Sequence, residues 1–334
     1  MSRALDKGVK EALKKGDHAK IFCELAGVLS QKHDQLLEIE LLPPSHELPG
    51  DAIYLQDGNA IAVPKLQLVQ AFIVARQGLK KLDKTQSFDD PKALLSLSGV
   101  MLLMDPEHLT AANTRKRILD DVYHRDDGKG RDLLLQEKYL IDSLLTSRLH
   151  RHTKSPTLWS HRRWLCGRLL GAGLSIDMAR ELRDVISVSA ERHPRNYYAW
   201  CHARLLLDLV GELDAAQMNI LVEDTRKWCL GHRSDISGWT FLQFLLERCH
   251  EDVLLSVFRD TLELVESFRW RNESVWCFLR TVSTWAAMKD SGRAELHRVL
   301  ALVRGGGEEE EDKTAKVFDY TDRWLELYSP ETRG

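Results

Sequence analysis

Basic side chains gather in one stretch of the sequence that contains no acid. Between positions 143 and 176 there is neither aspartate nor glutamate, but there are several cations: Arg148, Arg151, Lys154, Arg162, Arg163 and Arg168. Positive charge beside the free amides of a helix N-terminus can hold a phosphate group, because charge and amides both favour an anion. The stretch therefore predicts an anion-binding surface.

The histidines and cysteines do not indicate a metal site. His150, His152 and His161 form the nearest set of imidazoles, but no carboxylate lies between positions 143 and 176 to complete a zinc site. We interpret them as surface histidines. The 6 cysteines include no C-x-x-C pair, which excludes the common zinc-finger and redox spacings and favours a reducing compartment.

Two acidic pairs are also weak candidates for metal chemistry. Asp120-Asp121 and Asp126-Asp127 do not have the D-D-x-x-D spacing of a magnesium-diphosphate motif. Charge at a helix end is the better interpretation of both pairs. We expect no metal and no cofactor on this chain.

The composition is that of a soluble, folded protein. The 334 residues carry 47 basic and 50 acidic side chains, a formal net charge of −3, and 43% of them are hydrophobic. This near-neutral balance excludes a generally basic nucleic-acid binder. No apolar run is long enough for a secretion signal or a membrane span, so we expect a cytoplasmic protein.

Apolar residues at helical spacing run through most of the chain. A proline-rich, irregular excursion with a β-like stretch at 51–64 separates helical patterns at 19–42 and 65–82. No proline occurs between Pro194 and Pro330. Further helices are predicted at residues 131–150, 158–170, 176–192, 198–209, 214–230, 236–248, 252–268 and 274–288. These segments, joined by short polar breaks, predict an all-α fold of antiparallel helix pairs.

One pattern of side chains recurs along the predicted helices. Its tryptophans lie 41, 39 and 37 residues apart, at Trp159, Trp200, Trp239 and Trp276. Four residues before each stands a side chain of the helix N-cap type: Ser155, Asn196, Asp235 and Asn272. Four residues after each comes a long hydrogen-bonding side chain: Arg163, Arg204, Gln243 and Arg280. We interpret the tryptophans as hairpin core and the arginines as inter-repeat donors to helix-end carbonyls.

A period of about 40 residues with two helices is typical of an α-solenoid. We predict an alpha-alpha superhelix of about five helical hairpins, each burying its apolar stripe against its neighbours. A degraded upstream copy puts Ala112 at the tryptophan position and Lys116 at the arginine position. The predicted divisions are an N-terminal helical segment with the excursion (1–64), the repeats (65–290), and C-terminal helices with an acidic loop (291–334).

The third repeat carries a more specific pattern. Asn196-Tyr197-Tyr198-Ala199-Trp200, followed by Arg204, resembles the N-Y-x-x-W-x-x-x-R core of the protein prenyltransferase alpha-subunit repeat family. The resemblance covers roughly residues 41–288 and favours a divergent branch of that family. It implies an alpha-type subunit that wraps a beta subunit as a right-handed crescent of hairpins. The catalytic zinc and the isoprenoid cavity would then belong to the beta subunit.

The resemblance also implies partners and site residues. The implied partners are the beta subunit of Rab geranylgeranyltransferase, geranylgeranyl diphosphate, and proteins with a C-terminal cysteine, already farnesylated ones among the candidates. Lys154, directly before Ser155, matches a family lysine that reaches the isoprenoid diphosphate. Tyr197 and Tyr198 match aromatic positions that face the beta subunit. The resemblance further suggests that the helix-start side chains face substrate or partner: Ser155, Asn196, Asp235 and Asn272.

Other interpretations stay open on the residues alone. An isolated lysine ahead of a helix is usually a solvated surface residue, and a tyrosine pair there can be a staple over the helix start. Two function classes follow. The first is the alpha-type subunit of a protein geranylgeranyltransferase, inactive alone. The second is a helical-repeat scaffold without prenyltransferase activity, to which the degraded first repeat, Pro156 and Gln243 point.

Overall fold

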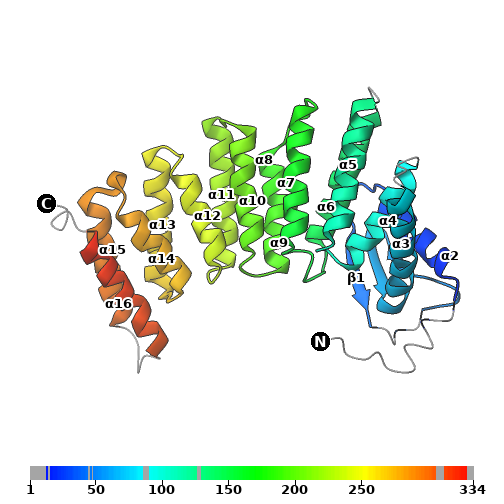
Figure 1. Cartoon of the computed structure of the whole chain (residues 1–334). Helices are drawn as coiled ribbons and strands as arrows, with labels where there is room; N and C mark the ends of the chain where they lie inside the picture. Colours follow the sequence, from blue (N-terminus) through cyan, green and yellow to red (C-terminus); the bar gives the residue numbers. More distant parts are fainter. Residues whose placement is uncertain are drawn as a thin grey trace. The chain divides into compact units, whose positions relative to one another are not determined.

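The computed structural model describes residues 13, 16–43, 46, 48–85, 90–125, 129–305 and 312–328 (Figure 1). The predicted acidic pair Asp126-Asp127 and residues 308–311 of the predicted acidic loop lie outside these residues. The chain divides into two compact units. Unit 1 comprises Met1–Asp177 and Asp184–Leu209, and unit 2 comprises Met178–Arg183 and Val210–Gly334. None of the described helices is long and apolar enough to cross a membrane.

The first described elements of unit 1 are a helix and a small sheet. Helix α2 (His18–Ser30) is followed by strands β1 (Glu38–Leu42), β2 (Leu55–Asp57) and β3 (Ala60–Pro64), in the order β1-β3-β2. β1 runs parallel to β3, with Ile39 opposite Ile61, and β2 runs antiparallel to β3. The helix predicted at 19–42 is therefore wrong beyond Ser30. Burial of Ile39 between exposed Glu38 and Glu40 has the two-residue period of a strand.

Serine hydroxyls of a later helix bind the backbone of β1 and the residue before it. The Leu37 and Ile39 amides donate to the Oγ atoms of Ser143 and Ser147, each at 3.0 Å. Ser143 lies in α6 (Lys129–Thr146), and Ser147 directly follows it. These contacts satisfy amides that would otherwise be buried without a partner, so the strand is fixed by residues more than 100 positions away.

The rest of unit 1 is a series of packed helices. They are α3 (Lys65–Thr85), α4 (Pro91–Met104), α5 (Leu109–Arg125), α6, α7 (Pro156–Gly171), α9 (Ser187–Arg192) and α10 (Tyr197–Val210). α3 packs between α2 and α4, and α6 packs against both α5 and α7. Leucines and an alanine form the core between α5, α6 and α7: Leu119, Leu134, Leu165, Leu169 and Ala172.

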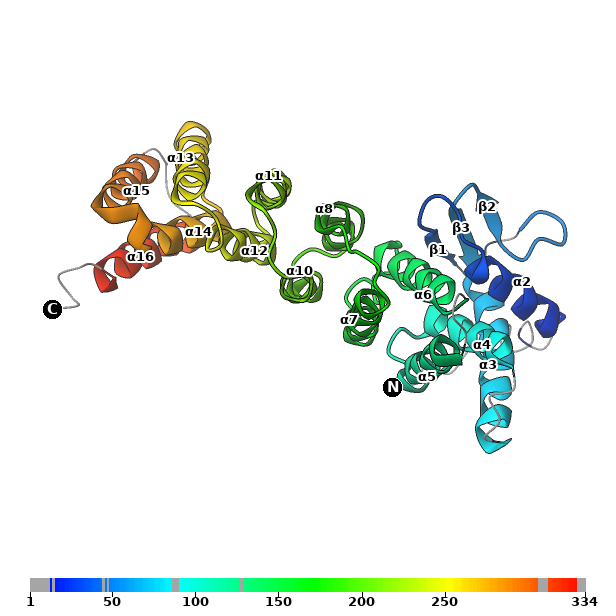
Figure 2. The same cartoon turned by 90° about the horizontal axis from the view of Figure 1, so that it is seen from above.

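Unit 2 consists of helices in two rows. The helices are α8 (Met178–Glu181), α11 (Ala215–Gly231), α12 (Ile236–Leu246), α13 (Glu251–Phe268), α14 (Glu273–Ser283), α15 (Lys289–Arg304) and α16 (Asp312–Leu327). Figure 2 shows α12, α14 and α16 in one row and α11, α13 and α15 in the other. α14 packs against α12 and α16, and α13 packs against α15. The predicted all-α helical-repeat fold is confirmed, and the right-handed crescent stays a prediction.

Several predicted helices differ in detail from the observed ones. The helix predicted at 131–150 ends at Thr146, and two others change their type of helix. The segment 176–192 is helical but contains a π-helical turn at Leu182–Ile186 between α8 and α9. The segment 274–288 ends its α-helix at Ser283 and continues as a short 3-10 helix at Ala286–Met288. Apolar periodicity alone does not report such changes of hydrogen-bond spacing.

Candidate functional site

The start of α7 is the region that the sequence indicated as an anion site. Ser155 caps this helix: its Oγ accepts from the Leu158 amide at 3.1 Å and donates to the Pro106 carbonyl at 3.1 Å. Pro156 occupies the first turn, where its missing N–H costs nothing. Ser155 is buried, so its side chain serves the cap and faces no partner.

Lys154 is exposed beside a pair of histidines. The Nδ1 atoms of His150 and His193 lie 2.9 Å apart, so one ring donates to the other. Burial lowers the pKa of His193, and the positive charge of Lys154 lowers it further. No described acid forms an ion pair with Lys154. Its ammonium is therefore a cation available to an anionic ligand.

Acids distant in sequence neutralise much of the basic stretch. Arg151, Arg162 and Arg168 form ion pairs with carboxylates on earlier helices or loops: Asp105, Asp142 and Asp120 respectively. The Thr157 hydroxyl at the start of α7 donates to the Glu107 carboxylate at 2.6 Å. Folding thus pairs three of the six cations with acids that the local sequence lacks, whereas Arg148, Lys154 and Arg163 stay exposed and form no ion pair with a described acid. Of these three, Lys154 stands directly before the N-cap of α7.

The start of α10 is tied to the start of α7. The Asn196 side chain donates from Nδ2 to the Thr153 carbonyl at 2.7 Å, and its Oδ1 accepts from the Ala199 amide at 3.4 Å. Asn196 is buried, whereas Tyr197 and Tyr198 are 63% and 41% exposed, with ring centres 6.0 Å apart. The exposed tyrosines and Lys154 are therefore held on two joined helix starts of unit 1.

The helix starts of unit 2 are fixed in two different ways. Asp235 is buried and accepts from the amides of Ser237 and Gly238 at 3.0 and 3.2 Å. Asn272 makes no capping bond and instead donates to Ser234 Oγ at 3.1 Å. The resemblance suggested that all four helix-start side chains face substrate or partner. This prediction is wrong for the three that are buried and bind groups of the protein itself: Ser155, Asn196 and Asp235.

The repeat tryptophans lie in the core of their units, where Trp159, Trp200, Trp239 and Trp276 are all buried. Trp159 and Trp276 donate from Nε1 to the carbonyl six residues earlier, that of Thr153 and Trp270, both at 2.9 Å. In these two repeats the tryptophan thus also stabilises the loop before its helix through a hydrogen bond.

The structure contradicts the role predicted for one of the repeat arginines, Arg280. Arg163 is exposed and Arg204 is partly buried. Arg280 binds Glu273 of its own helix at 2.7 Å, rather than a carbonyl of the next repeat. The interpretation as inter-repeat donors is therefore wrong for Arg280. The buried arginines stand one position earlier, at Arg115 in α5 and Arg162 in α7.

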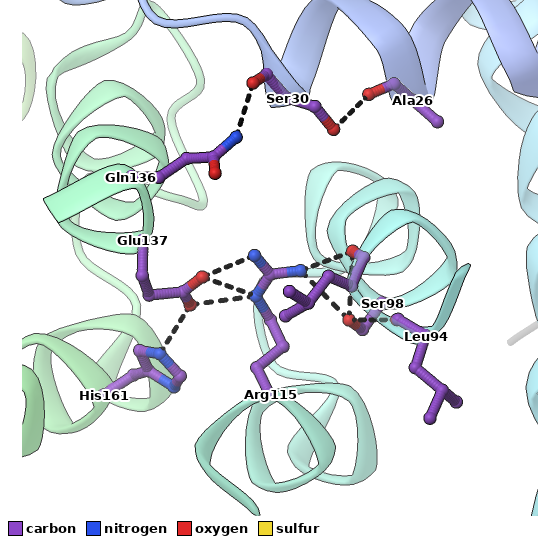
Figure 3. A network of polar contacts seen from close by, with 9 residues as sticks. Ala26, Ser30, Leu94, Ser98, Arg115, Gln136, Glu137 and His161 are labelled. Atoms are coloured by element: carbon purple, nitrogen blue, oxygen red, sulfur yellow. Dashed lines mark hydrogen bonds and ion pairs between the residues drawn. The ribbon is translucent and has the colours of Figure 1, made fainter. Parts of the chain in front are cut away.

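Figure 3 shows the buried network around Arg115. Its guanidinium donates to both carboxylate oxygens of Glu137, to the Leu95 carbonyl and to Ser98. His161 contacts the same carboxylate at 2.8 Å. Burial, the largest influence, raises the pKa of Glu137, but the Arg115 charge and the hydrogen bonds from His161 and Arg115 together hold it at about 2. The carboxylate therefore stays ionised inside the protein.

A second network joins α6, α7 and α10. Arg162 donates from Nε to Asp142 at 2.7 Å, and Lys138 pairs with the same carboxylate. Nη1 of Arg162 lies 2.6 Å from Nε2 of His202, so His202 accepts from it as a neutral imidazole. Burial, and then the Arg162 charge, lower the pKa of His202 well below its ordinary value. The sequence pattern held no signal for the acids of either network.

The histidines of the basic stretch do not come together as a metal site. His152 is buried and donates from Nε2 to the carbonyls of Leu102 and Leu103, each at 3.0 Å, while His161 is engaged with Glu137. The interpretation as surface histidines is wrong for these two. In the part of the chain that the structure describes, no three His, Cys, Asp or Glu side chains are grouped to hold a metal ion.

Comparison with known proteins identifies relatives of this chain. A family model described as the ECM9 middle domain matches residues 158–268. "Protein prenyltransferase alpha subunit repeat-containing protein 1" of Danio rerio is 27% identical over 246 residues, which are 58% of this chain and 55% of the relative. "Protein ECM9" of Saccharomyces cerevisiae is 29% identical over 245 residues, 71% of this chain and 61% of the relative.

A more distant relative carries the name of an enzyme subunit. "Geranylgeranyl transferase type-2 subunit alpha" of Sus scrofa is 25% identical over 225 residues, 63% of this chain and 37% of the relative. The chain thus matches about half the length of these curated relatives, from 37% to 61%. The predicted resemblance to the protein prenyltransferase alpha-subunit repeat family is confirmed.

Proposed function

We propose that this chain is the alpha-type subunit of a heterodimeric protein geranylgeranyltransferase. It would support a beta subunit of the kind found in Rab geranylgeranyltransferase and help to bind the isoprenoid diphosphate. The acceptor would be a C-terminal cysteine of a protein, with already farnesylated proteins among the candidates. The observation that carries this proposal is that the exposed Lys154 and the exposed Tyr197 and Tyr198 lie on two helix starts that the Asn196–Thr153 hydrogen bond joins.

Lys154 suits a diphosphate leaving group. In prenyl transfer the acceptor sulfur forms a thioether bond to C1 of the isoprenoid as the C1–O bond breaks, and both bonding electrons leave with the diphosphate. Negative charge grows on that group during the step, and a cation placed beside it stabilises the transition state more than the ground state. No described acid pairs with Lys154, so its charge is available for this purpose.

Tyr197 and Tyr198 suit a protein partner. Exposed tyrosines supply contact area at low entropic cost and keep a polar tip that can reach water or a hydrogen-bond partner. The buried Asn196 anchors this pair to the preceding helix start, so its position relative to Lys154 is fixed before any partner binds. Because the described residues offer no metal-ligand set, the zinc of the reaction is expected on the beta subunit.

Co-expression tests the assembly part of the proposal. The chain and the Rab geranylgeranyltransferase beta subunit should elute together on size exclusion as a one-to-one complex at micromolar concentration. Elemental analysis should find about one zinc per complex and far less on the isolated chain. Separate elution of the two chains would contradict the proposal. Stoichiometric zinc on the isolated chain would contradict the assignment of the metal to the beta subunit.

A protein-binding scaffold without activity is the second candidate function. One observation favours it: Glu107 binds the Thr157 hydroxyl at the start of α7 and thus puts an acid near the place where a diphosphate would lie. A scaffold would assemble with partners but transfer no isoprenoid. A complex that co-elutes, binds geranylgeranyl diphosphate no better than the beta subunit alone, and shows no turnover would establish this alternative.

A further inference from the structure

We propose that unit 2 carries a separate protein-docking surface that takes an acidic segment with an apolar side chain. The surface, here called the stacked-arginine surface, consists of Arg233, Phe268, Arg269, Trp270 and Leu302. It lies at the loops before α12 and α14 and at the end of α15. This inference goes beyond the proposed prenyltransferase role, which rests on residues of unit 1.

Three side chains of this surface form a stack. The guanidinium carbon of Arg233 lies 4.8 Å from the centre of the Trp270 ring. The Phe268 ring lies 5.9 Å from Trp270 with only 20° between the ring planes. Arg233 and Trp270 each stand six residues before a repeat tryptophan, Trp239 and Trp276. The stack therefore joins equivalent loops of two consecutive repeats.

The backbone around the stack is held in place before any ligand arrives. The Trp270 amide donates to the Val265 carbonyl at 3.2 Å, and the Trp270 carbonyl accepts from Trp276 Nε1 at 2.9 Å. Arg269 caps α13 in the left-handed conformation (φ 52°) and donates from Nη1 to the Leu302 carbonyl at 2.7 Å. A rigid stack loses little conformational freedom when it binds, which favours recognition.

The exposed atoms of the surface specify the chemistry of its ligand. Phe268 is 65% exposed and Leu302 is 37% exposed, so an apolar side chain could cover them. Arg233 is exposed with its guanidinium over the Trp270 ring, a contact that uses none of its N–H groups as hydrogen-bond donors to an acceptor such as a carboxylate. No described carboxylate pairs with Arg233. A carboxylate beside an apolar side chain complements both halves of the surface.

Charge favours a protein over a nucleic acid as the ligand. The stack itself presents Arg233 and Arg269, and the whole chain has a net charge of −3. A nucleic-acid site needs a broader basic stripe that follows successive phosphates. The acid nearby in α13, Glu266, is bound through both oxygens by Arg298 at 2.8 Å, so it does not satisfy Arg233.

Fluorescence polarisation of a labelled peptide tests the proposal on the full chain. The probe is a fluorescein-labelled peptide that alternates glutamate with leucine and phenylalanine. We expect saturable binding that Arg233→Glu weakens at least about tenfold, because an attractive charge becomes repulsive. Arg248→Glu is the matched control: Arg248 also stacks on an aromatic ring, 3.6 Å from the centre of Phe244, but outside this surface. It should leave binding unchanged.

Further measurements distinguish an acidic peptide from other ligands of this surface. A probe with glutamine in place of glutamate should bind at least about tenfold more weakly, because the carboxylates supply the charged hydrogen bonds. The proposal is overturned if the acidic probe does not saturate, if Arg248→Glu weakens binding as much as Arg233→Glu, or if a single-stranded oligonucleotide displaces the probe at lower concentration. Binding that appears only after Glu308–Glu311 are replaced by serine would overturn it too, because the chain's own acids would then be the occupant. None of these readouts involves prenyl transfer.

Discussion

At the same position of the repeat, the early repeats bury a charged side chain and the late repeats bury an apolar one. Three residues after the repeat aromatic position, α5 and α7 bury Arg115 and Arg162, whereas α12 and α14 bury Leu242 and Leu279. A buried leucine stabilises its helix against any apolar neighbour. A buried arginine is tolerated only where a carboxylate meets it in the right geometry. The stability of the early repeats therefore depends on particular carboxylate partners. The stability of the late repeats depends mainly on how well apolar side chains fill the core.

The position of the acids shows how specific the early packing is. Glu137 and Asp142 both lie on α6, which packs between α5 and α7, and they serve Arg115 and Arg162 respectively. Each arginine thus pairs with a different carboxylate of the same helix, α6. We infer that these pairs fix the alignment of α5, α6 and α7, at a cost in charge desolvation that an apolar core would avoid.

Loss of one buried partner should have the largest effect. Glu137→Ala should lower the free energy of unfolding by about 3–5 kcal/mol, because it leaves the Arg115 charge buried without its carboxylate. Urea denaturation measures this loss, and hydrogen exchange should locate it in peptides from unit 1. Leu279→Ala is the counterpart in unit 2 and should cost about 2–5 kcal/mol there through a cavity. A cost below about 1 kcal/mol for Glu137→Ala would contradict the account of the network.

Removal of both partners should sharpen the comparison. Arg162→Met and Asp142→Leu should each destabilise strongly alone, whereas the double variant should come within about 2 kcal/mol of wild type, because no unpaired charge remains buried. Lys138 is partly exposed and can reach water when its carboxylate is gone. A double-mutant cycle by chemical denaturation measures the coupling. Additive losses would show that the pair does not act as a unit.

Acid should weaken unit 1 before unit 2. Burial, the largest cause, lowers the pKa values of His152, His161 and His202, and the pKa of His152 falls to about 4. A group whose pKa is lower in the folded state gives stability above its unfolded pKa of 6.5 that is lost as pH falls toward 4. For His152 the full loss is on the order of 3 kcal/mol.

One substitution tests this pH dependence. Gln in place of His152 can still donate to the Leu102 and Leu103 carbonyls but does not titrate. Denaturation at pH 7 and at pH 4.5 should therefore show a smaller acid loss for His152→Gln than for wild type. The same loss in both proteins would exclude His152 as a source of the pH dependence.

The helix caps should show the smallest effects. Asp235→Ala should cost about 1 kcal/mol because two amides of α12 lose their acceptor. Asn272→Ala should cost about 0.5 kcal/mol or less, since Asn272 makes no capping bond. Thermal unfolding of the two variants gives the order. The reverse order would mean that the bond from Asn272 to Ser234 matters more than the cap of α12.

The sequence predicts the helical-repeat class because local signals repeat. The Trp periodicity, the N-cap residues and the absence of proline after Pro194 all report on short segments, and those segments fold as helices. The strand β1 is missed because its residues also fit a helical period. The alternation of apolar and acidic residues from Leu37 to Leu41 fits a strand as well, and the distant hydroxyls of Ser143 and Ser147 and the pairing with β3 decide for the strand.

The candidate site was predictable only in part, because charge neutralisation is a tertiary property. Lys154 and the tyrosine pair can be read from a local pattern, and the structure exposes them. The partners of Arg151, Arg162 and Arg168 come from other helices and loops, so the sequence of residues 143–176 alone overstates the positive charge. The repeat pattern predicted Arg163 as the hydrogen-bonding arginine of α7, but the helix buries Arg162, one position earlier.

Lys154 is proposed to contribute to isoprenoid transfer in a complex with a beta subunit. The direct test is single-turnover transfer of geranylgeranyl to a cysteine-tailed protein by complexes matched for subunit ratio. Lys154→Ala should lower the rate by roughly ten- to a hundredfold, because one charged donor to the leaving diphosphate is lost. Arg163→Ala, a second exposed cation in the same region, should transfer at the wild-type rate. Equal rates for Lys154→Ala and wild type would contradict the claim.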